Sequence, residues 1–388
     1  MKKALFKLIS VTMICVILLS SVLGVQAFAQ QIEIKEKTPV LDENGYLTQS
    51  GYCFTPLYQY DRSAIKTSPL KTKEWDFYQI SNDRYTVQVT IADISLGGAV
   101  TVGYFDRETG ESNSTMVLNL LTLGKFKLGY GNGGLCQDDS QPHKYVRKGL
   151  NFDFENEVTA TQRTLKFKGK AGLKDFTVDL VLEMLPEHES HYIAVPFDNG
   201  AGRRFYYNQK TNCMATTGTV TCGDTSFEFK GKEDNSYAVL DWGRGVWPFH
   251  QVWWWGNGST TLDNGDVFGF EIGWGFGDTS CASESTAFLN GKAYKLGYLS
   301  LVDEDGIVKP LDSNWADNGK EWKIVSDDGS FEMTMTPEYD NYTMLRFLFV
   351  GNLCHQVFGK WNGTVRLGDE TIEIKDMTAF LERSDNMW

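Results

Sequence analysis

Three carboxylic acids in the second half of the chain lie close in sequence to aromatic residues and could donate protons. They are Asp241, Asp278 and Glu284, and the nearby groups that could tune them are Arg244 and His250. Packing an Asp among indole rings disfavours its ionised form, which raises its pKa and suits general-acid chemistry. Arg244 would oppose this effect by stabilising the carboxylate. For each acid, a salt bridge or a turn cap is the alternative interpretation.

The aromatic residues are concentrated in one stretch, residues 240–258, which holds five of the eleven tryptophans. Alternate residues of a strand face the same way. One face of such a strand would carry Asp241, Trp247, Phe249, Gln251, Trp253 and Trp255, and the other would carry His250, Val252 and Trp254. Ligand pockets combine apolar walls with a few polar groups, so the candidate ligand-binding residues are Trp242, Trp247, Phe249, Trp253, Trp255 and Trp274. The alternative is a core strand in which Asp241 and Arg244 form a satisfied ion pair.

The next stretch, residues 267–278, predicts a strand with one glycine-rich face. That face carries Glu271, for which solvent exposure is expected, between four glycines: Gly269, Gly273, Gly275 and Gly277. Glycine weakens a strand and gives no packing, so another group should lie close against this backbone. We expect an aromatic-rich neighbouring strand there, with a ligand as the alternative.

Several of these segments resemble the DUF2804 family of uncharacterised proteins. The residues that carry the resemblance are Asp-Trp-Gly-Arg-Gly-Val-Trp-Pro at 241–248, Gly-Phe-Gly-Asp-Thr-Ser at 275–280 and Glu284. Further matching pieces lie at 65–66, 73–78, 90–93, 205–208 and 218–220. The resemblance implies a grouping and no reaction. An Asp beside tryptophans in a central strand is also similar, more weakly, to AttH and carotenoid-hydratase proteins, which pair two lipocalin-like units.

Alternating runs and turn pairs dominate the rest of the sequence. Residues 85–91 alternate as in a half-buried strand, and Gly-containing turn pairs recur at 109–110, 132–133, 264–265, 290–291, 305–306, 328–329 and 362–363. Such pairs suit tight hairpins because both residues accept positive φ. The sequence therefore predicts an all-β protein of two related antiparallel units, lipocalin-like barrels or sandwiches, packed together.

Two echoes in the same order predict where the units divide. Lys-Leu-Gly-Tyr at 127–130 recurs at 295–298, and the segment at 184–191 resembles that at 335–342. Repeated segments in a fixed order indicate duplication, with coincidence between generic turn sequences as the alternative. The expected units are residues 30–199 and 200–388, the second carrying the tryptophan stretch.

The first 29 residues have the layout of a signal peptide, with Lys2, Lys3 and Lys7 before an apolar run and Ala27-Phe28-Ala29 after it. We expect cleavage after Ala29 and a secreted or cell-envelope location, with an uncleaved membrane anchor as the alternative. No later membrane span is expected. The net charge of -13 argues against nucleic acid as a partner.

Cysteine and histidine spacing gives little sign of a metal site, and neither a metal nor a cofactor is expected. Six cysteines follow the leader, and Cys213 and Cys222 could face each other across a hairpin and form a disulfide.

The favoured function is binding of an apolar or amphiphilic ligand in an aromatic-lined cavity where the two units meet. If the protein is an enzyme, acid-assisted hydration or isomerisation is expected, with Asp241 as the acid and Arg244 and His250 as its tuning partners. The alternative is a carbohydrate-binding or carbohydrate-active protein, in which tryptophans stack on sugars and carboxylates bind hydroxyls. A structural envelope protein with tryptophans only in its core is the third possibility.

Overall fold

The computed structural model of the protein describes residues 30–126, 128, 143–185, 187–197, 202–309, 321–347 and 350–387. Residues 31–388 form one compact unit. The predicted signal peptide, Cys136 and the 132–133 turn pair lie outside the described residues, as does the 127–130 segment apart from Leu128. Among the described residues, no helix is long and apolar enough to span a membrane.

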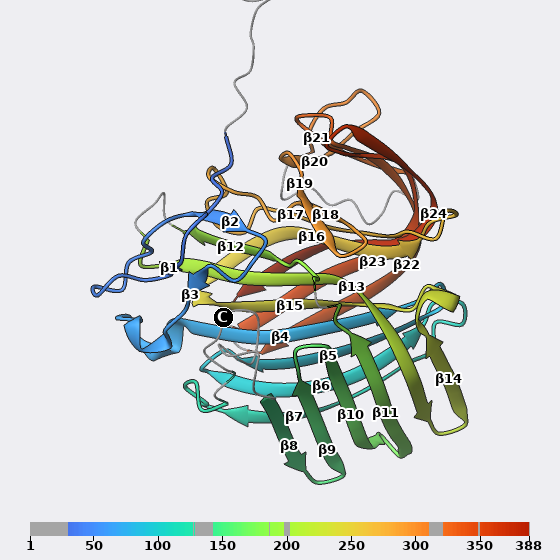
Figure 1. The fold of residues 1–388 in the computed structure, drawn as a ribbon. Helices are drawn as coiled ribbons and strands as arrows, with labels where there is room; N and C mark the ends of the chain where they lie inside the picture. The colour runs from blue at the N-terminus through green and yellow to red at the C-terminus, as the bar shows by residue number, and fades with distance from the viewer. Residues whose placement is uncertain are drawn as a thin grey trace, which may run out of the picture. The chain divides into compact units, whose positions relative to one another are not determined.

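The first of two large sheets has thirteen strands (Figure 1), and its main path runs β7-β6-β5-β4-β15-β13-β11-β10-β9-β8. In sequence order these strands are β4 (Thr72–Ser81), β5 (Tyr85–Asp93), β6 (Gly97–Asp106), β7 (Ser112–Leu120), β8 (His143–Gly149), β9 (Phe152–Val158), β10 (Gln162–Ala171), β11 (Lys174–Glu183), β13 (Phe205–Cys222) and β15 (Tyr237–Val246). Off the path, β2 (Gly51–Cys53) and β12 (His191–Pro196) pair with each other, and β12 and β14 (Thr225–Lys230) pair with β13.

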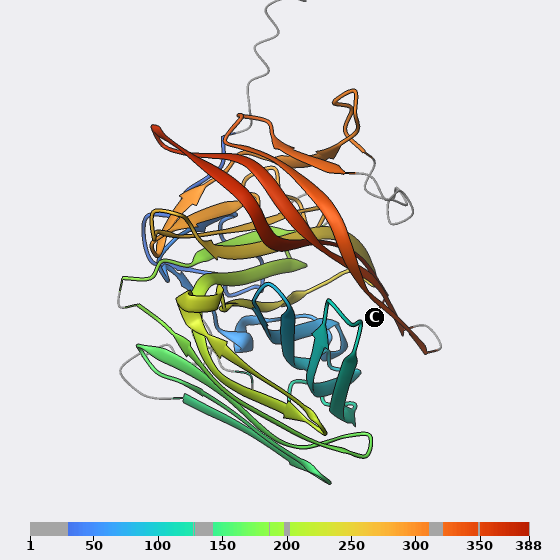
Figure 2. The same ribbon diagram turned by 90° about the vertical axis from the view of Figure 1, so that its right-hand side faces the viewer.

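The second sheet has nine strands in the order β19-β18-β17-β16-β24-β23-β22-β21-β20. They are β16 (His250–Thr261), β17 (Val267–Trp274), β18 (Thr286–Leu289), β19 (Lys292–Lys295), β20 (Leu299–Val302), β21 (Trp322–Ser326), β22 (Phe331–Phe347), β23 (Val350–Leu367) and β24 (Glu370–Met387). The long strands β22 to β24, orange to red, twist across the view in Figure 2. All pairings in both sheets are antiparallel, which confirms the predicted fold class.

Short elements complete the described chain. The strands β1 (Thr38–Pro39) and β3 (Tyr58–Gln59) form a parallel pair. Three short 3-10 helices are η1 (Arg62–Ala64), η2 (Pro69–Lys71) and η3 (Gly231–Asp234). Asp61 and Ser68 cap the first two, since their side chains accept from backbone amides two residues later.

Each sheet packs a hydrophobic core on one face. In the first sheet, alternate residues of β4 to β6 such as Tyr78, Val89 and Val102 enter one large core with β9 to β11. In the second sheet, Trp254 and Trp361 lie in a separate core built from β16 to β24. Because strand side chains alternate, each sheet has a second face, and these second faces bear the candidate site.

Several expected turns are present, and one is wrong. Asn290 and Gly291, both with positive φ, connect β18 to β19 as a two-residue hairpin turn. The pair at 362–363 lies instead inside β23, where the pairing with β24 shifts register between Trp361 and Gly363. A bulge can accommodate a glycine without ending a strand.

The expected Cys213–Cys222 disulfide is also wrong. Both cysteines lie in the single long strand β13 and are free thiols. Nine residues of strand separate them by roughly 30 Å. Residues 216–222 continue the strand by pairing with β11 and β14, so the supposed turn between the cysteines does not form.

The chain passes from one sheet to the other between Val246 and His250. The expected unit boundary at 199–200 falls on residues outside those described, and β13 to β15 beyond it belong to the first sheet. The division into duplicated units therefore stays a prediction. Of the second echo, residues 184–190 connect β11 to β12, whereas residues 335–342 lie within β22.

Candidate functional site

A cavity of about 350 Å³ lies between the second faces of the two sheets. Strands β4, β5, β13 and β15 form one wall, and β16 and β22 to β24 form the other. Its aromatic lining residues are Trp75, Phe77, Tyr206, Trp247, Trp253, Trp255 and Phe276. Its size is within the range of small-molecule sites.

The strand β15 explains why this wall has room for a ligand. Asp241 and Trp247 line the cavity, and between them Gly243 and Gly245 face the same way. A Cβ at Gly243 would lie 2.0 Å from the Trp75 ring, and one at Gly245 would lie 2.7 Å from Trp247 Nε1. The two glycines therefore let the indole rings of Trp75 and Trp247 approach the backbone of β15 closely.

Asp241 is held by two donors from the neighbouring strand β13. Its Oδ1 lies 3.2 Å from Lys210 Nζ and accepts a hydrogen bond of 2.5 Å from the Asn208 amide. The Lys210 ammonium is buried and also lies 4.6 Å from the centre of the Trp255 ring. Burial alone would lower the pKa of Lys210, but Asp241, Glu284 and Glu271 raise it above its ordinary value. Lys210 is thus charged, and its ammonium pairs with the Asp241 carboxylate at the cavity.

Two further carboxyl groups lie around Lys210. Glu284 lines the cavity with Oε2 3.9 Å from Lys210 Nζ. Glu271 lies behind the wall, where its Oε2 accepts 3.0 Å from Trp255 Nε1 and its Oε1 accepts 3.3 Å from the Asn212 amide. Burial raises the pKa of Glu284, and raises that of Glu271 well above its usual value, while Lys210 opposes both shifts in part. The three carboxyl groups around Lys210 therefore carry less negative charge than three ionised carboxylates would.

The opposite wall contributes Glu382 from β24. Trp253 Nε1 donates to Glu382 Oε1 at 3.1 Å, and the Gln356 amide donates to Oε2 at 3.2 Å. The Cys354 thiol contacts the same Oε2 at 3.7 Å. Burial first, and the charge of Asp241 second, raise the pKa of Glu382 against the opposing effect of its hydrogen bonds, to about 7. Glu382 can therefore give or take a proton near neutral pH.

Amide side chains surround Glu382 on this wall. Gln356 Oε1 accepts at 2.6 Å from Gln88, which reaches across from β5, and Asn352 donates to Asn386 at 2.6 Å. Asn341 and Ser384 also line the cavity. The surface formed by β22 to β24 is thus mainly polar, whereas the aromatic rings come from both sheets, on β4, β13 and β16 and just after β15 and β17. A ligand with an apolar side and a polar side would match both surfaces.

Arg244 belongs to a different part of the protein, which corrects its expected pairing with Asp241. Residues 241 and 244 face opposite sides of β15, and Arg244 enters the first sheet's interior. Its Nη2 lies 2.9 Å from Asp76 Oδ1, and its Nη1 donates to the Trp75 carbonyl at 2.7 Å. The guanidinium also lies 3.9 Å from the Trp242 ring centre and contacts the Leu128 carbonyl.

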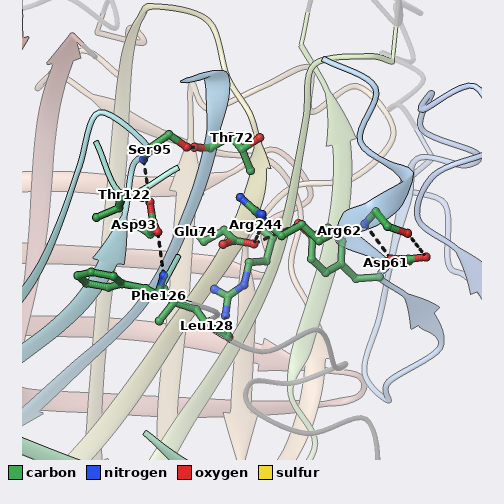
Figure 3. A network of polar contacts seen from close by, with 12 residues as sticks. Asp61, Arg62, Thr72, Glu74, Asp93, Ser95, Thr122, Phe126, Leu128 and Arg244 are labelled. Atoms are coloured by element: carbon green, nitrogen blue, oxygen red, sulfur yellow. Dashed lines mark hydrogen bonds and ion pairs between the residues drawn. The ribbon is translucent and has the colours of Figure 1, made fainter. Parts of the chain in front are cut away.

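Figure 3 shows this interior polar network. Beside Arg244, Glu74 accepts from Arg62 at 3.0 Å. Asp93 accepts from the Thr122 hydroxyl at 2.6 Å and from the Phe126 amide at 3.2 Å. These contacts join β4, β5 and η1 to the segment after β7, which indicates a structural role.

The remaining expected site residues are distributed as follows. Trp242 is buried in the first core, and Trp254 stacks on Trp274 in the second core at 5.7 Å. Phe249 is 53% exposed, and His250 pairs at the surface with Asp385 at 2.8 Å. Asp278 accepts from the Ser280 amide, as a turn cap does. The structure therefore brings Asp241, Glu284, Trp247, Trp253 and Trp255 together in the cavity.

The glycine-rich face of β17 was correctly expected to lie against another group. A Cβ at Gly269 would lie 2.4 Å from Cys213 Sγ, and one at Gly273 would lie 2.4 Å from Glu284 Oε2. The groups are thus β13 and the Glu284 side chain, whereas aromatic residues were expected. Glu271, expected in solvent, is fully buried beside them.

The sequence reasoning missed Lys210 and Glu382. In β24, residues 382–386 read Glu-Arg-Ser-Asp-Asn, a run of polar residues without alternation that also fits a solvent-exposed segment. Lys210 stands alone in β13 without a local signal. Within the part of the chain that the structure describes, no group of three His, Cys, Asp or Glu side chains is placed to hold a metal ion.

Residues 31–388 match the family described as "Domain of unknown function (DUF2804)", and the chain belongs to that family. No curated protein is similar enough in sequence to count as a relative. Solved structures that resemble the chain include a putative AttH from Nitrosomonas europaea, with 12% identity and a TM-score of 0.46 over 81% of this chain and 92% of that chain. Another is kievitone hydratase from Nectria haematococca, with 11% identity and a TM-score of 0.43 over 93% of this chain and 98% of that one. The resemblance to the DUF2804 family expected from the sequence is confirmed by the match over residues 31–388.

Proposed function

We propose that the protein binds a small, uncharged amphiphilic molecule in the cavity between its two sheets. The observation that carries this proposal is the divided lining of the cavity, which combines a cluster of aromatic rings from both sheets with a polar surface on β22 to β24. The one ammonium, Lys210, already contacts Asp241, and burial favours the neutral forms of Glu284 and Glu382. A ligand without net charge would leave the Lys210–Asp241 pair intact and would not favour ionisation of Glu284 or Glu382.

The ring geometry supports an apolar skeleton over a stacked sugar. Trp247 meets Trp75 at 74°, Trp253 meets Phe276 at 65°, and Trp255 meets Phe77 at 77°. Edge-to-face rings form an irregular apolar surface, whereas a sugar face needs an exposed flat ring.

If the protein is an enzyme, we propose addition of water to a carbon–carbon double bond. The protonated Glu382 would give its proton to one alkene carbon, and water would form a C–O bond to the other. Asp241 would accept the proton that this water loses, and transfer of that proton back to Glu382 through solvent would restore both groups. Without water, loss of a proton from a neighbouring carbon to Asp241 would move the double bond. Arg244 and His250 have no part in this scheme.

The test is native mass spectrometry of protein purified from its host, before and after extraction with organic solvent. A bound small molecule is expected, which extraction removes. Ala92→Trp would fill the cavity and should abolish the adduct, because Ala92 lines it. Leu173→Trp is the matched control, since Leu173 is 96% exposed in the turn after β10. An adduct that persists in Ala92→Trp would contradict the proposed location.

The amide side chains of the cavity favour a second candidate, a glycan ligand. The side chains of Gln88, Gln356, Asn341, Asn352 and Asn386 line the cavity and could bind sugar hydroxyls. A glycan array separates the candidates, because specific binding that Ala92→Trp abolishes would replace the amphiphile with a sugar.

We also propose that the protein is exported, on the strength of the leader at residues 1–29. N-terminal sequencing of protein from the native host should begin at Gln30. A start at Met1 in the mature protein would reject cleavage.

A further inference from the structure

We propose that the cavity continues into an open groove that binds the apolar chain of the ligand, over β6 and β7 on one side and β22 on the other. The proposed ligand class is therefore a long-chain amphiphile whose polar end lies near Asp241 and Glu382. This inference rests on the proposed function and adds the chain and its binding surface.

The first observation is a row of residues on one face of the first sheet. Directly paired residues of neighbouring strands point to the same face. The row that contains Asp241 continues through Phe77 in β4 and Thr90 in β5, which line the cavity, to Thr101 in β6 and Met116 in β7. From Thr90 to Met116 is two strand spacings, roughly 10 Å.

The next row of paired residues on this face also leads from the cavity to exposed apolar residues of β7. Trp75 and Ala92 line the cavity, and the row leads through Ala99 to Leu118. Leu120 follows on the same face of β7, whereas Val117 faces the other way and packs against the first core. Met116, Leu118 and Leu120 are 56%, 58% and 77% exposed. The outer strand of the sheet thus presents three large apolar side chains in line with the cavity wall.

The second sheet supplies the facing side of the groove. On β22, Asn341 and Thr343 line the cavity, and Leu345 follows on the same face, opposite the cavity residue Asn352. Leu345 is 59% exposed. Both sheets therefore carry exposed apolar residues just beyond the cavity.

Aromatic contacts close the space at one end. Phe105, near the end of β6, stacks on Tyr339 of β22 at 5.5 Å and meets Phe358 at 5.4 Å. From this contact β6 runs back to Gly97 and β22 runs on toward Leu345, past the cavity residues. The groove thus has a closed aromatic end, and its rim carries Leu118, Leu120 and Leu345.

The occupant that fits is the chain of the ligand itself. Isolated exposed apolar residues are common, but a contiguous stripe marks a binding surface. This stripe is continuous with the cavity, and the charged groups Lys210, Asp241 and Glu382 lie away from it, on β13, β15 and β24. An amphiphile with its polar end beside Asp241 and Glu382 would place its chain along the stripe.

The probe is a series of 1-monoacylglycerols with acyl chains of about 6 to 14 carbons, used below their aggregation concentrations. Binding is measured by quenching of tryptophan fluorescence and by native mass spectrometry. Each methylene removed from water adds up to about fourfold in affinity. The affinity should therefore continue to rise with chain length after the cavity is filled.

The test variant is Leu118→Asp, with Leu173→Asp as the matched control. Both leucines are exposed, so both variants should fold, which their melting temperatures check. Leu118→Asp should weaken binding of the longest chains at least tenfold and leave the shortest unchanged, and Leu173→Asp should change neither. Equal chain-length dependence in the wild type and Leu118→Asp would overturn the groove.

Two other outcomes separate this inference from the proposed function. If short chains bind, Ala92→Trp abolishes their binding and Leu118→Asp affects no length, the cavity stands and the groove is rejected. If no monoacylglycerol of any length binds, the amphiphile proposal fails and the groove fails with it. If the wild type is a dimer that Leu118→Asp converts to monomers, the stripe is a contact between two copies of the chain, which also overturns the groove.

Discussion

The two faces of β15 use similar residues for opposite purposes. On one face, Arg244 pairs with Asp76 and packs on Trp242 inside the first sheet, where the groups around it are backbone carbonyls and core side chains. On the other face, Asp241 pairs with Lys210 beside a cavity, with Trp247 further along the strand. An ion pair next to a tryptophan is therefore no sign of function by itself. The empty space beside Asp241 makes the difference.

The largest expected effect is on the core face. Arg244→Met should lower the free energy of unfolding by about 3–5 kcal/mol, because the Asp76 carboxylate would stay buried without the opposite charge of Arg244. Chemical denaturation measures this loss. The double variant Arg244→Met, Asp76→Leu should recover much of it, and a single variant as stable as the wild type would show that the pair is not needed.

The next effect is a pH dependence of the free energy of unfolding that comes from Glu382 in β24. The pKa of Glu382 is raised from 4.5 to about 7, so the folded protein holds this proton more tightly than the unfolded chain does. Such a group stabilises the fold fully below pH 4.5, and that contribution is lost as the pH rises to 7. Relative to the wild type, Glu382→Gln should therefore gain about 3 kcal/mol between pH 4.5 and pH 8.

Denaturation at both pH values measures the Glu382 effect, with Glu228→Gln on an exposed position of β14 as the control, which should follow the wild type. A stability difference between Glu382→Gln and the wild type that is the same at both pH values would contradict a protonated Glu382.

On the cavity face, Asp241→Asn should cost about 1.5–3 kcal/mol, the scale of one charged hydrogen bond. Glu284 lies 3.9 Å from Lys210 and can become its partner. The same variant should nevertheless lose the small-molecule adduct or the turnover. A loss of stability as large as that of Arg244→Met, with ligand binding retained, would make both faces structural.

The smallest effect is expected for His250→Ala. The His250–Asp385 pair is half exposed, and exposed pairs contribute up to about 1 kcal/mol. Ligand binding and melting temperature should both stay close to the wild type. A marked loss of ligand binding in His250→Ala would show that His250 contributes to the binding site.

The sequence predicted the elements better than it predicted their partners. Alternation in the tryptophan stretch correctly grouped Asp241, Trp247, Trp253 and Trp255 on one surface, even though two strands, β15 and β16, share the stretch. Phe249 failed because the chain leaves β15 at Val246 and turns before β16 begins at His250. Phe249 lies in the turn, where side chains do not follow the alternation of a strand.

The partners of Asp241 come from distant parts of the chain. Lys210, Glu382 and Gln88 reach the cavity through the order of strands in the two sheets, which local patterns do not encode. Arg244 is three residues from Asp241 in the sequence and was expected to pair with it. In the strand, however, the two side chains face opposite sides. Glu271 was expected in solvent because a charged residue between glycines reads as exposed, but β13 covers it.

The most direct test of the account is a crystal structure of the protein with the molecule that co-purifies with it, or with a monoacylglycerol that binds. Ligand density is expected between the two sheets, touching Trp253 and Glu382 on one wall and Phe77 and Asp241 on the other. Density inside the packed interior of either sheet, with the space between the sheets filled only by water, would contradict it.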